Sequence, residues 1–316
     1  MDEIEFKLEV GRITGEIPVK PCVRSKPERG FALAESRFPE PAKAEPVPVR
    51  KGMSVAEGFE TIVANCLRHF QANEPLVIES RDARALHQAR VAMRRLRSAL
   101  ALFRPVISDR QFARIRHELR WLGAELGGAR NLDMYLERDL GADQRQFVEE
   151  RREKAYDLAI AALKSARSMR LMLELVDWSA SGSWRSGRRA GARLQPFVAR
   201  RVDRLWSKIA KSDGVSDLTD RQRHRLRIKT KKLRYALAFF DALHRRRPHR
   251  KKRFTKRIKV LQESLGRLHD EVIAGTIATA DSWLAAPNRT PRSKRRLVRD
   301  ADRAIRRLRK AGPYWS

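Results

Sequence analysis

The chain has 316 residues, enough for one large or two small domains with a hydrophobic core. Lys and Arg number 70 against 38 Asp and Glu, and the net charge of +32 points to a polyanionic partner: nucleic acid, an anionic membrane or polyphosphate. Cys22 and Cys66 offer neither a disulfide framework nor a zinc site, no secretory signal opens the sequence, and no apolar run is long enough to span a membrane. We therefore expect a cytoplasmic protein.

Residues 1–51 differ in character from the rest and are predicted to form an N-terminal segment and linker. Residues 3–10 alternate charged and apolar side chains, a pattern typical of a strand. Within it, Glu3, Glu5 and Lys7 form an ExExK pattern that could hold Mg²⁺ and a triphosphate inside a barrel of strands. Prolines spaced along residues 39–48 indicate an extended linker instead, so we expect no barrel and no catalysis.

Helical periodicity begins at Ser54, which forms a capping box with Glu57. Each helix predicted in the first half is bounded by a cap, a proline or a glycine. In chain order these helices run from Ser54 to before Pro75, from Asp82 to Pro105, from Asp109 to Gly127-Gly128, from Asn131 to Leu140 and from Asp143 to Trp178.

The Ser/Gly-rich residues 179–188 are predicted to be a flexible joint. A second series of helices follows, and no strand is indicated after residue 11. These helices run from about Ala190 to Ala210, from after Asp220, from Pro248 to Leu268, from Asp270 to Ala285 and from Ser293 to Lys310.

The helix that begins at Asp82 has two opposed faces at 100° per residue. No acidic residue lies between Asp82 and Asp109, so nothing within the helix neutralises its cations. The apolar arc comprises Ala89, Ala92, Met93, Leu96, Ala99, Leu100 and Phe103. The basic arc comprises His87, Arg90, Arg94 and Arg97, with Arg95 at its edge.

The same pattern recurs in the second half of the chain, with Leu126-Gly127 recurring as Leu265-Gly266. A repeat of this length indicates two copies of one helical unit. If the copies are related by a pseudo-two-fold axis, their basic helices would line one groove, where low-dielectric walls concentrate positive potential. The basic residues of the second copy are His224, Arg227, Lys231, Lys232 and Arg234.

Two further basic runs, residues 245–253 and 294–309, could be solubilising or could bind a polyanion. Asp300 and Asp302 are expected to screen the second run in part. A basic helix face can also be merely solvated surface, but the repetition of the same cations in two copies argues against that reading here. The sequence contains no Walker A loop, G-x-S-x-G, HExxH or DxD motif, so no catalytic or metal-binding residue is assigned.

The helices HQARVAMRRLRSALALF and HRLRIKTKKLRYALAFF resemble the two signature helices of the conserved-histidine α-helical (CHAD) domain. The resemblance covers residues 52–312 and implies an all-α fold of two pseudo-symmetric four-helix bundles, about 53–178 and 189–311, with a basic central cavity or groove. It also implies polyphosphate binding by the ten basic residues named above and targeting to polyphosphate granules. Asn131 departs from the family, which commonly has Asp there; the second copy has Asp270.

The N-terminal segment resembles a remnant of a triphosphate-tunnel (CYTH) domain, in its ExExK pattern and in residues 24–34. We therefore expect a non-catalytic polyphosphate-binding protein that needs no cofactor. The alternative is a non-specific nucleic-acid-binding protein, against which stand the scarcity of aromatic residues near the basic arcs and the lack of a helix-turn-helix. A residual phosphohydrolase is the third possibility, and the missing barrel argues against it.

Overall fold

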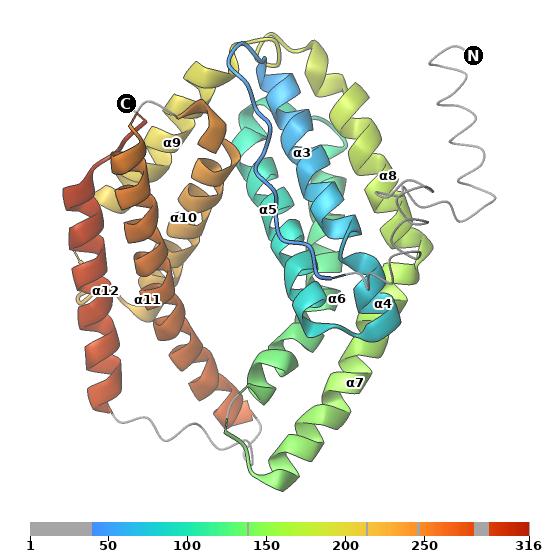
Figure 1. The fold of residues 1–316 in the computed structure, drawn as a ribbon, viewed down its shortest axis with the longest axis vertical. Helices are drawn as coiled ribbons and strands as arrows, with labels where there is room; N and C mark the ends of the chain where they lie inside the picture. The colour runs from blue at the N-terminus through green and yellow to red at the C-terminus, as the bar shows by residue number, and fades with distance from the viewer. Residues whose placement is uncertain (1–39, 138, 213, 245–246, 281–290, 316) are drawn as a thin grey trace. The chain divides into compact units, whose positions relative to one another are not determined.

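The computed structural model describes residues 40–315 except 138, 213, 245–246 and 281–290, and for 270–280 and 291–293 it describes the backbone alone. Every regular secondary-structure element of the described residues is helical, which confirms the predicted all-α class (Figure 1). The chain divides into two compact units. Of the described residues, the first unit holds 40–45 and Phe59–Gly187, and the second holds Pro46–Gly58 and the chain from Arg188 onward.

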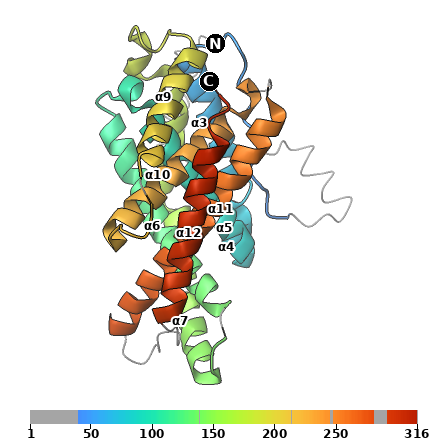
Figure 2. The same ribbon diagram turned by 90° about the vertical axis from the view of Figure 1, so that its left-hand side faces the viewer.

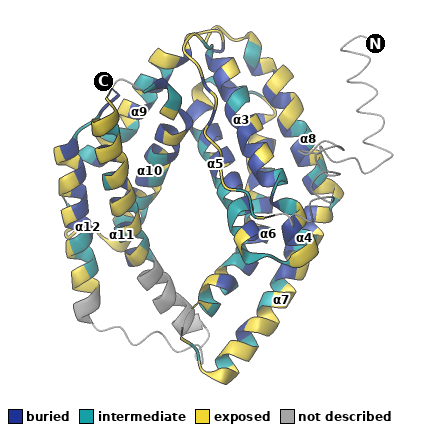
Figure 3. Cartoon of the chain, viewed as in Figure 1, coloured by how far each residue is buried: buried dark blue, intermediate teal, exposed yellow. Residues whose placement is uncertain are grey.

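The first unit is built from helices whose inward residues are buried along one face and whose outward residues are exposed (Figure 3). None of the helices described in either unit has the length and hydropathy needed to cross a membrane. The elements of this unit are α3 (Val55–Gln71, which begins in the second unit), α4 (Glu74–Ser80), α5 (Ala83–Ile107), α6 (Phe112–Leu136), α7 (Ala142–Lys164), α8 (Ala166–Ser181) and the short 3₁₀ helix η1 (Ser183–Ser186).

An aromatic cluster joins distant parts of the first unit. The ring of Phe59 lies 5.2 Å from Phe103, 5.6 Å from Trp178 and 5.4 Å from Trp184, measured between centroids. Trp184 lies in η1, within the segment predicted to be a flexible joint. The prediction of a flexible joint is wrong here. Burying Trp184 in an aromatic cluster stabilises the fold, and this free energy of burial holds the segment in place.

Several predicted helix ends in the first unit are also wrong. α6 continues through Gly127 and Gly128, so the predicted helix from Asn131 to Leu140 is largely its last turns. Two glycines cost about 2 kcal/mol of helix propensity relative to alanine, but the buried Leu126 and Ala129 on the same helix offset that cost by packing.

Two further helix ends differ from the prediction, one at Pro105 and one at Ser165. α5 continues past Pro105 to Ile107, whose side chain is fully buried. The predicted helix from Asp143 to Trp178 is two helices, broken at Ser165. The hydroxyl of Ser165 accepts a hydrogen bond from Ser168 N at 3.2 Å and so caps α8.

The second unit contains α9 (Leu194–Ala210), α10 (Asp220–Phe239), the 3₁₀ helix η2 (Asp241–Leu243), α11 (Pro248–Ala280) and α12 (Pro291–Ala311). The predicted break at Asp270 is absent because α11 runs through it as one helix. The core includes Phe254, whose ring centroid lies 5.3 Å from Trp206 and 5.1 Å from Trp315. Trp315 therefore ties the C-terminal residues to α9 and α11, a role that the sequence pattern did not indicate.

The described part of the N-terminal segment, residues 40–50, has no regular secondary structure. Ala42 O accepts hydrogen bonds from His69 Nε2 at 3.1 Å and Asn73 Nδ2 at 3.0 Å, so this segment is held against α3. The predicted strand 3–10, its ExExK pattern and residues 24–34 lie outside the described residues.

Candidate functional site

The basic arc of α5 lies opposite a fully packed apolar face. Asp82 caps the helix by accepting hydrogen bonds from Arg84 N at 2.7 Å and Ala85 N at 3.0 Å. The cap and the apolar period together fix which side chains face outward. Seven residues of the predicted apolar arc are buried: Ala89, Ala92, Met93, Leu96, Ala99, Leu100 and Phe103.

The structure brings together four of the five predicted basic residues of α5 and separates the fifth. His87, Arg90 and Arg94 are half-buried and Arg97 is exposed, all on the side away from the apolar arc. Arg95 is instead only 5% exposed, and its Nη2 donates to Asn65 Oδ1 at 2.8 Å. Arg95 lies at the edge of the basic arc, so periodicity alone does not predict whether its side chain points inward or outward. The hydrogen bond to Asn65 on α3 holds it inward.

Two glycines of α6 leave the helix backbone uncovered by side chains where two of these arginines lie against it. Arg90 Nη1 donates to Gly123 O at 3.2 Å. A Cβ atom added to Gly127 would lie 3.0 Å from Arg90 Nη1, and one added to Gly123 would lie 3.7 Å from Arg97 Nη1. The two glycines, four residues apart, therefore let the guanidinium groups lie against the α6 backbone.

Two further arginines of α6 complete what we call the α5–α6 cation group: His87, Arg90, Arg94, Arg97, Arg120 and Arg130. The charge of Arg130 acts on both His87 and Arg90, and the charge of Arg120 acts on Arg97. Sequence reasoning did not assign either residue to the site. The available signal was the pair of glycines spaced for close helix approach, with Arg130 one turn after Gly127.

Burial and mutual repulsion dominate the electrostatics of this group. Burial, and then the charges of Arg94, Arg130 and Arg97, lower the pKa of Arg90 to about 10. Burial and then the charges of Arg130, Arg94 and Arg90 lower the pKa of His87. The pKa of Arg97, whose residue is exposed as a whole, is lowered by partial desolvation of its guanidinium and by the charge of Arg120. A lowered pKa in a cation means that its charged form is disfavoured, so an anion placed here would relieve an unfavourable charge.

Carboxylates near Arg130 come from residues other than position 131. Arg130 Nη1 lies 3.9 Å from Asp133 Oδ2, and Nη2 lies 3.5 Å from Glu137 Oε1. Asp133 is buried and also accepts from Arg152 Nε at 2.9 Å, which ties α6 to α7. Asn131 is exposed, and the side chain of its second-copy counterpart Asp270 lies outside the described residues.

In the second unit, α10 begins with a capping box in which Gln222 N donates to Thr219 Oγ1 and Thr219 N donates to Gln222 Oε1 at 2.7 Å. Leu226, Leu233, Ala236 and Leu237 are buried. We call the outward residues the α10 basic face: His224, Arg227, Lys231 and Arg234, which are half-buried, and Lys232, which is exposed.

The α10 basic face is supported by α11 and by one aromatic ring. His224 Nδ1 lies 3.4 Å from Nδ1 of His269, and the ring centroids are 4.6 Å apart. The guanidinium of Arg234 lies 5.0 Å from the ring centroid of Tyr235, which is itself buried. His269 is a third residue that sequence reasoning missed, and it occupies the place that Arg130 has in the first repeat.

Several of these side chains keep an unused hydrogen-bond donor. Within the described chain, the Nε atoms of Arg90, Arg130 and Arg234 are buried without a hydrogen-bond partner. These Nε atoms are enclosed by protein, so a ligand meets the accessible part of each guanidinium, whose fork of N–H donors suits an oxyanion with several acceptor oxygens. The predicted groove between the two repeats stays a prediction.

Comparison with known proteins places these helices in a family. The family model of the CHAD domain matches residues 61–279. The crystal structure of the CHAD domain from the plant Ricinus communis is 29% identical with a TM-score of 0.69, covering 86% of this chain and 96% of that one. PptA from Streptomyces chartreusis, 19% identical with a TM-score of 0.53, covers 82% of this chain and 99% of its own and shows the fold alone. No curated protein matches the chain.

Proposed function

The chain belongs to the CHAD domain family, and from this membership we propose that it binds inorganic polyphosphate without catalysing a reaction. The ligand is held by the α5–α6 cation group and the α10 basic face. The observation that carries the proposal is the set of half-buried cations around Arg90, whose pKa is lowered by burial and by other arginines. Such a set is unfavourable without a bound anion.

Inorganic polyphosphate matches the chemistry of these surfaces. It is a linear chain with a negative charge on every phosphate, and arginine forks donate two parallel hydrogen bonds to phosphate oxygens. Cations spaced at three and four residues along a helix lie about 5–6 Å apart, so one chain can engage several of them in succession. Binding releases counterions, and its affinity falls steeply with salt.

A nucleic-acid ligand suits these particular faces less well. Single-stranded nucleic acid is held largely by stacking of bases on exposed aromatic rings. Tyr235, the aromatic residue adjacent to the α10 basic face, is 7% exposed and lies beneath the guanidinium of Arg234. The residues that remain accessible therefore favour a ligand made of phosphates alone.

The cellular setting follows from the ligand. We propose that the protein is cytoplasmic and associates with polyphosphate granules, where long polyphosphate chains concentrate. The resemblance to the CHAD family supports this expectation, and binding by preformed arginines requires neither a metal ion nor a cofactor. We assign no catalytic residue.

Charge reversal in both repeats tests the proposal. The double variant Arg94→Glu, Lys231→Glu should abolish binding of long-chain polyphosphate while the circular-dichroism helix signal stays unchanged. The matched control is Arg104→Glu, Lys208→Glu, which changes the net charge equally at exposed positions of α5 and α9 outside the two faces. Equal losses in both variants, or wild-type affinity in the first, would show that these faces do not hold the ligand.

A further inference from the structure

A second basic surface lies on α12, which packs along α11 and meets the start of α10 through an ion pair of 3.3 Å between Lys294 Nζ and Asp220 Oδ2. α12 packs along α11, which in turn packs against α10, so α11 separates α12 from most of α10 (Figures 1 and 2). Ala301, Ala304, Ile305 and Leu308 of α12 are buried. The other face of α12 is consequently turned to solvent and cannot belong to the α10 basic face.

The solvent-facing side of α12 carries a straight row of cations. Their separations alternate between three and four residues, which places them on one face of the helix. The row spans about 21 Å at 1.5 Å per residue. Its members, all exposed, are Arg296, Arg299, Arg303, Arg306 and Lys310, and the four arginines line a shallow cavity of about 380 Å³.

The acidic residues of α12 leave most of this charge unneutralised. Asp300 forms an ion pair with Arg303. Asp302 is buried and accepts hydrogen bonds from Val215 N and the Ser216 hydroxyl, and among the row its carboxylate interacts with the charge of Arg306, so the predicted screening is partial. Like charges at this spacing destabilise a helix, so the row is a candidate binding surface for an anion.

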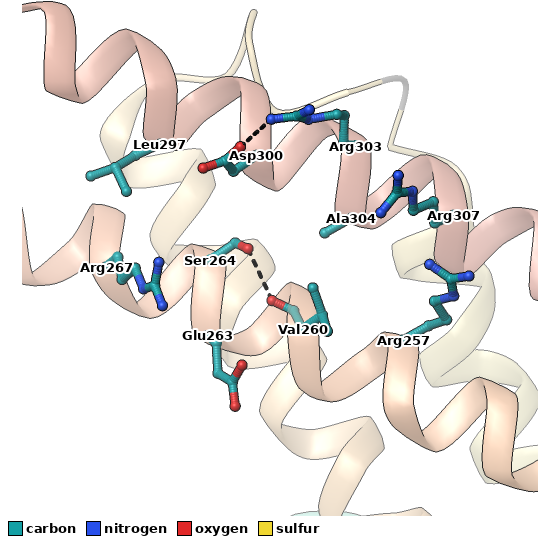
Figure 4. A pocket seen from close by; sticks show the side chains of 10 residues that line it. All are labelled: Arg257, Val260, Glu263, Ser264, Arg267, Leu297, Asp300, Arg303, Ala304 and Arg307. Atoms are coloured by element: carbon teal, nitrogen blue, oxygen red, sulfur yellow. Dashed lines mark hydrogen bonds and ion pairs between the residues drawn. The ribbon is translucent and has the colours of Figure 1, made fainter.

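A cleft between α11 and α12 extends the row sideways (Figure 4). It has a volume of about 360 Å³, and Arg257 and Arg307 point into it at one end. Neither arginine makes an ion pair among the described residues. Together with the four arginines of the row they form what we call the α11–α12 arginine surface: Arg257, Arg296, Arg299, Arg303, Arg306 and Arg307.

We propose that the α11–α12 arginine surface binds the phosphate backbone of double-stranded DNA without sequence preference. The row is straight and lies on one helix, and duplex DNA is a stiff rod with one charge per about 1.7 Å of axis, so the two linear arrays of charge can lie along each other. A flexible polyphosphate chain would lose more conformational entropy than a stiff duplex when it is held straight along this row. A membrane is disfavoured because the apolar face of α12 is already buried in the protein.

The row of arginines itself explains the expected lack of sequence preference. Its side chains are spread along one helix face as separate phosphate contacts, and such contacts position a protein on DNA without reading the bases. The proposal does not depend on polyphosphate binding by the other two surfaces, and its test is designed to separate the two.

The test uses the triple variant Arg296→Ala, Arg299→Ala, Arg306→Ala, which leaves the Asp300–Arg303 ion pair in place. Binding of a short mixed-sequence duplex is measured by fluorescence anisotropy over a series of salt concentrations. Three lost phosphate contacts should reduce the slope of log K against log salt by about 2.7 and the affinity at 0.1 M salt by roughly 500-fold. Alanine keeps the helix intact because it has the highest helix propensity.

A matched control removes the same charge from another exposed helix row of the same unit. The residues are Arg200, Arg204 and Lys208 of α9, each replaced by alanine. We expect this variant to keep the wild-type slope and the α12 variant to keep wild-type polyphosphate affinity. Equal effects of the two triple variants on DNA would overturn the proposal, and so would a parallel loss of polyphosphate binding in the α12 variant.

Discussion

Replacing Arg90 by methionine should stabilise the protein and weaken its binding of polyphosphate. The pKa of Arg90 is lowered to about 10 by burial and by three neighbouring arginines. At 1.36 kcal/mol per pKa unit this corresponds to about 3 kcal/mol of unfavourable charge in a dry site. Solvent at this half-buried position reduces that to about 1–2 kcal/mol. The variant also loses the hydrogen bond from Arg90 to Gly123 O, which lowers the stability gained. We therefore expect the free energy of unfolding to rise by about 1 kcal/mol in total.

Urea denaturation of the ligand-free protein measures the stability, and titration with polyphosphate measures the affinity. Losing one charge-assisted contact costs about 1.5–3 kcal/mol of binding, or roughly 10- to 100-fold. The control is Arg104→Met on the same helix, an exposed position where both quantities should stay close to wild type. A destabilised Arg90→Met protein, or one with undiminished affinity, would refute the reasoning.

Three further predictions follow from the same contacts. Gly127→Ala should lower polyphosphate affinity several-fold, since its Cβ would lie 3.0 Å from a guanidinium nitrogen, whereas Gly128→Ala, in ordinary contact, should leave titration curves unchanged. Because burial and neighbouring cations lower the pKa of His87, a bound phosphate should raise that pKa and draw a proton onto the ring, so affinity should rise as the pH falls into the acidic range, and His87→Gln should flatten that rise. Asp133→Ala should lower the free energy of unfolding by about 3 kcal/mol, measured by denaturation, because Arg152 loses its buried carboxylate partner.

The sequence predicts most of what defines α5. A capping aspartate, a strict apolar period and the absence of acids settle its start and its two faces, and the buried residues match the apolar arc. The helical wheel fails at Arg95, which sits at the boundary between the faces. Its direction depends on Asn65 of another helix, and the periodicity of one helix contains no information about that partner.

Local signals were weakest where tertiary packing overrides them. Gly127 and Gly128 indicate a helix end by propensity, yet α6 continues because its apolar residues pack on both sides of them. Gly127 also leaves room for the guanidinium of Arg90 against the α6 backbone, a role that emerges only when α5 and α6 are placed together. Arg130 and His269 were missed for the same reason, since each joins its site from the neighbouring helix.

The most direct test of the central claim is the binding of purified protein to long-chain polyphosphate with duplex DNA as competitor at physiological salt. We expect tight polyphosphate binding that excess DNA, compared at equal phosphate concentration, does not displace, because the half-buried arginines of α5 and α10 suit a chain of bare phosphates. Displacement of polyphosphate by DNA at equal phosphate concentration would contradict the account and show that the positive charge acts without selectivity.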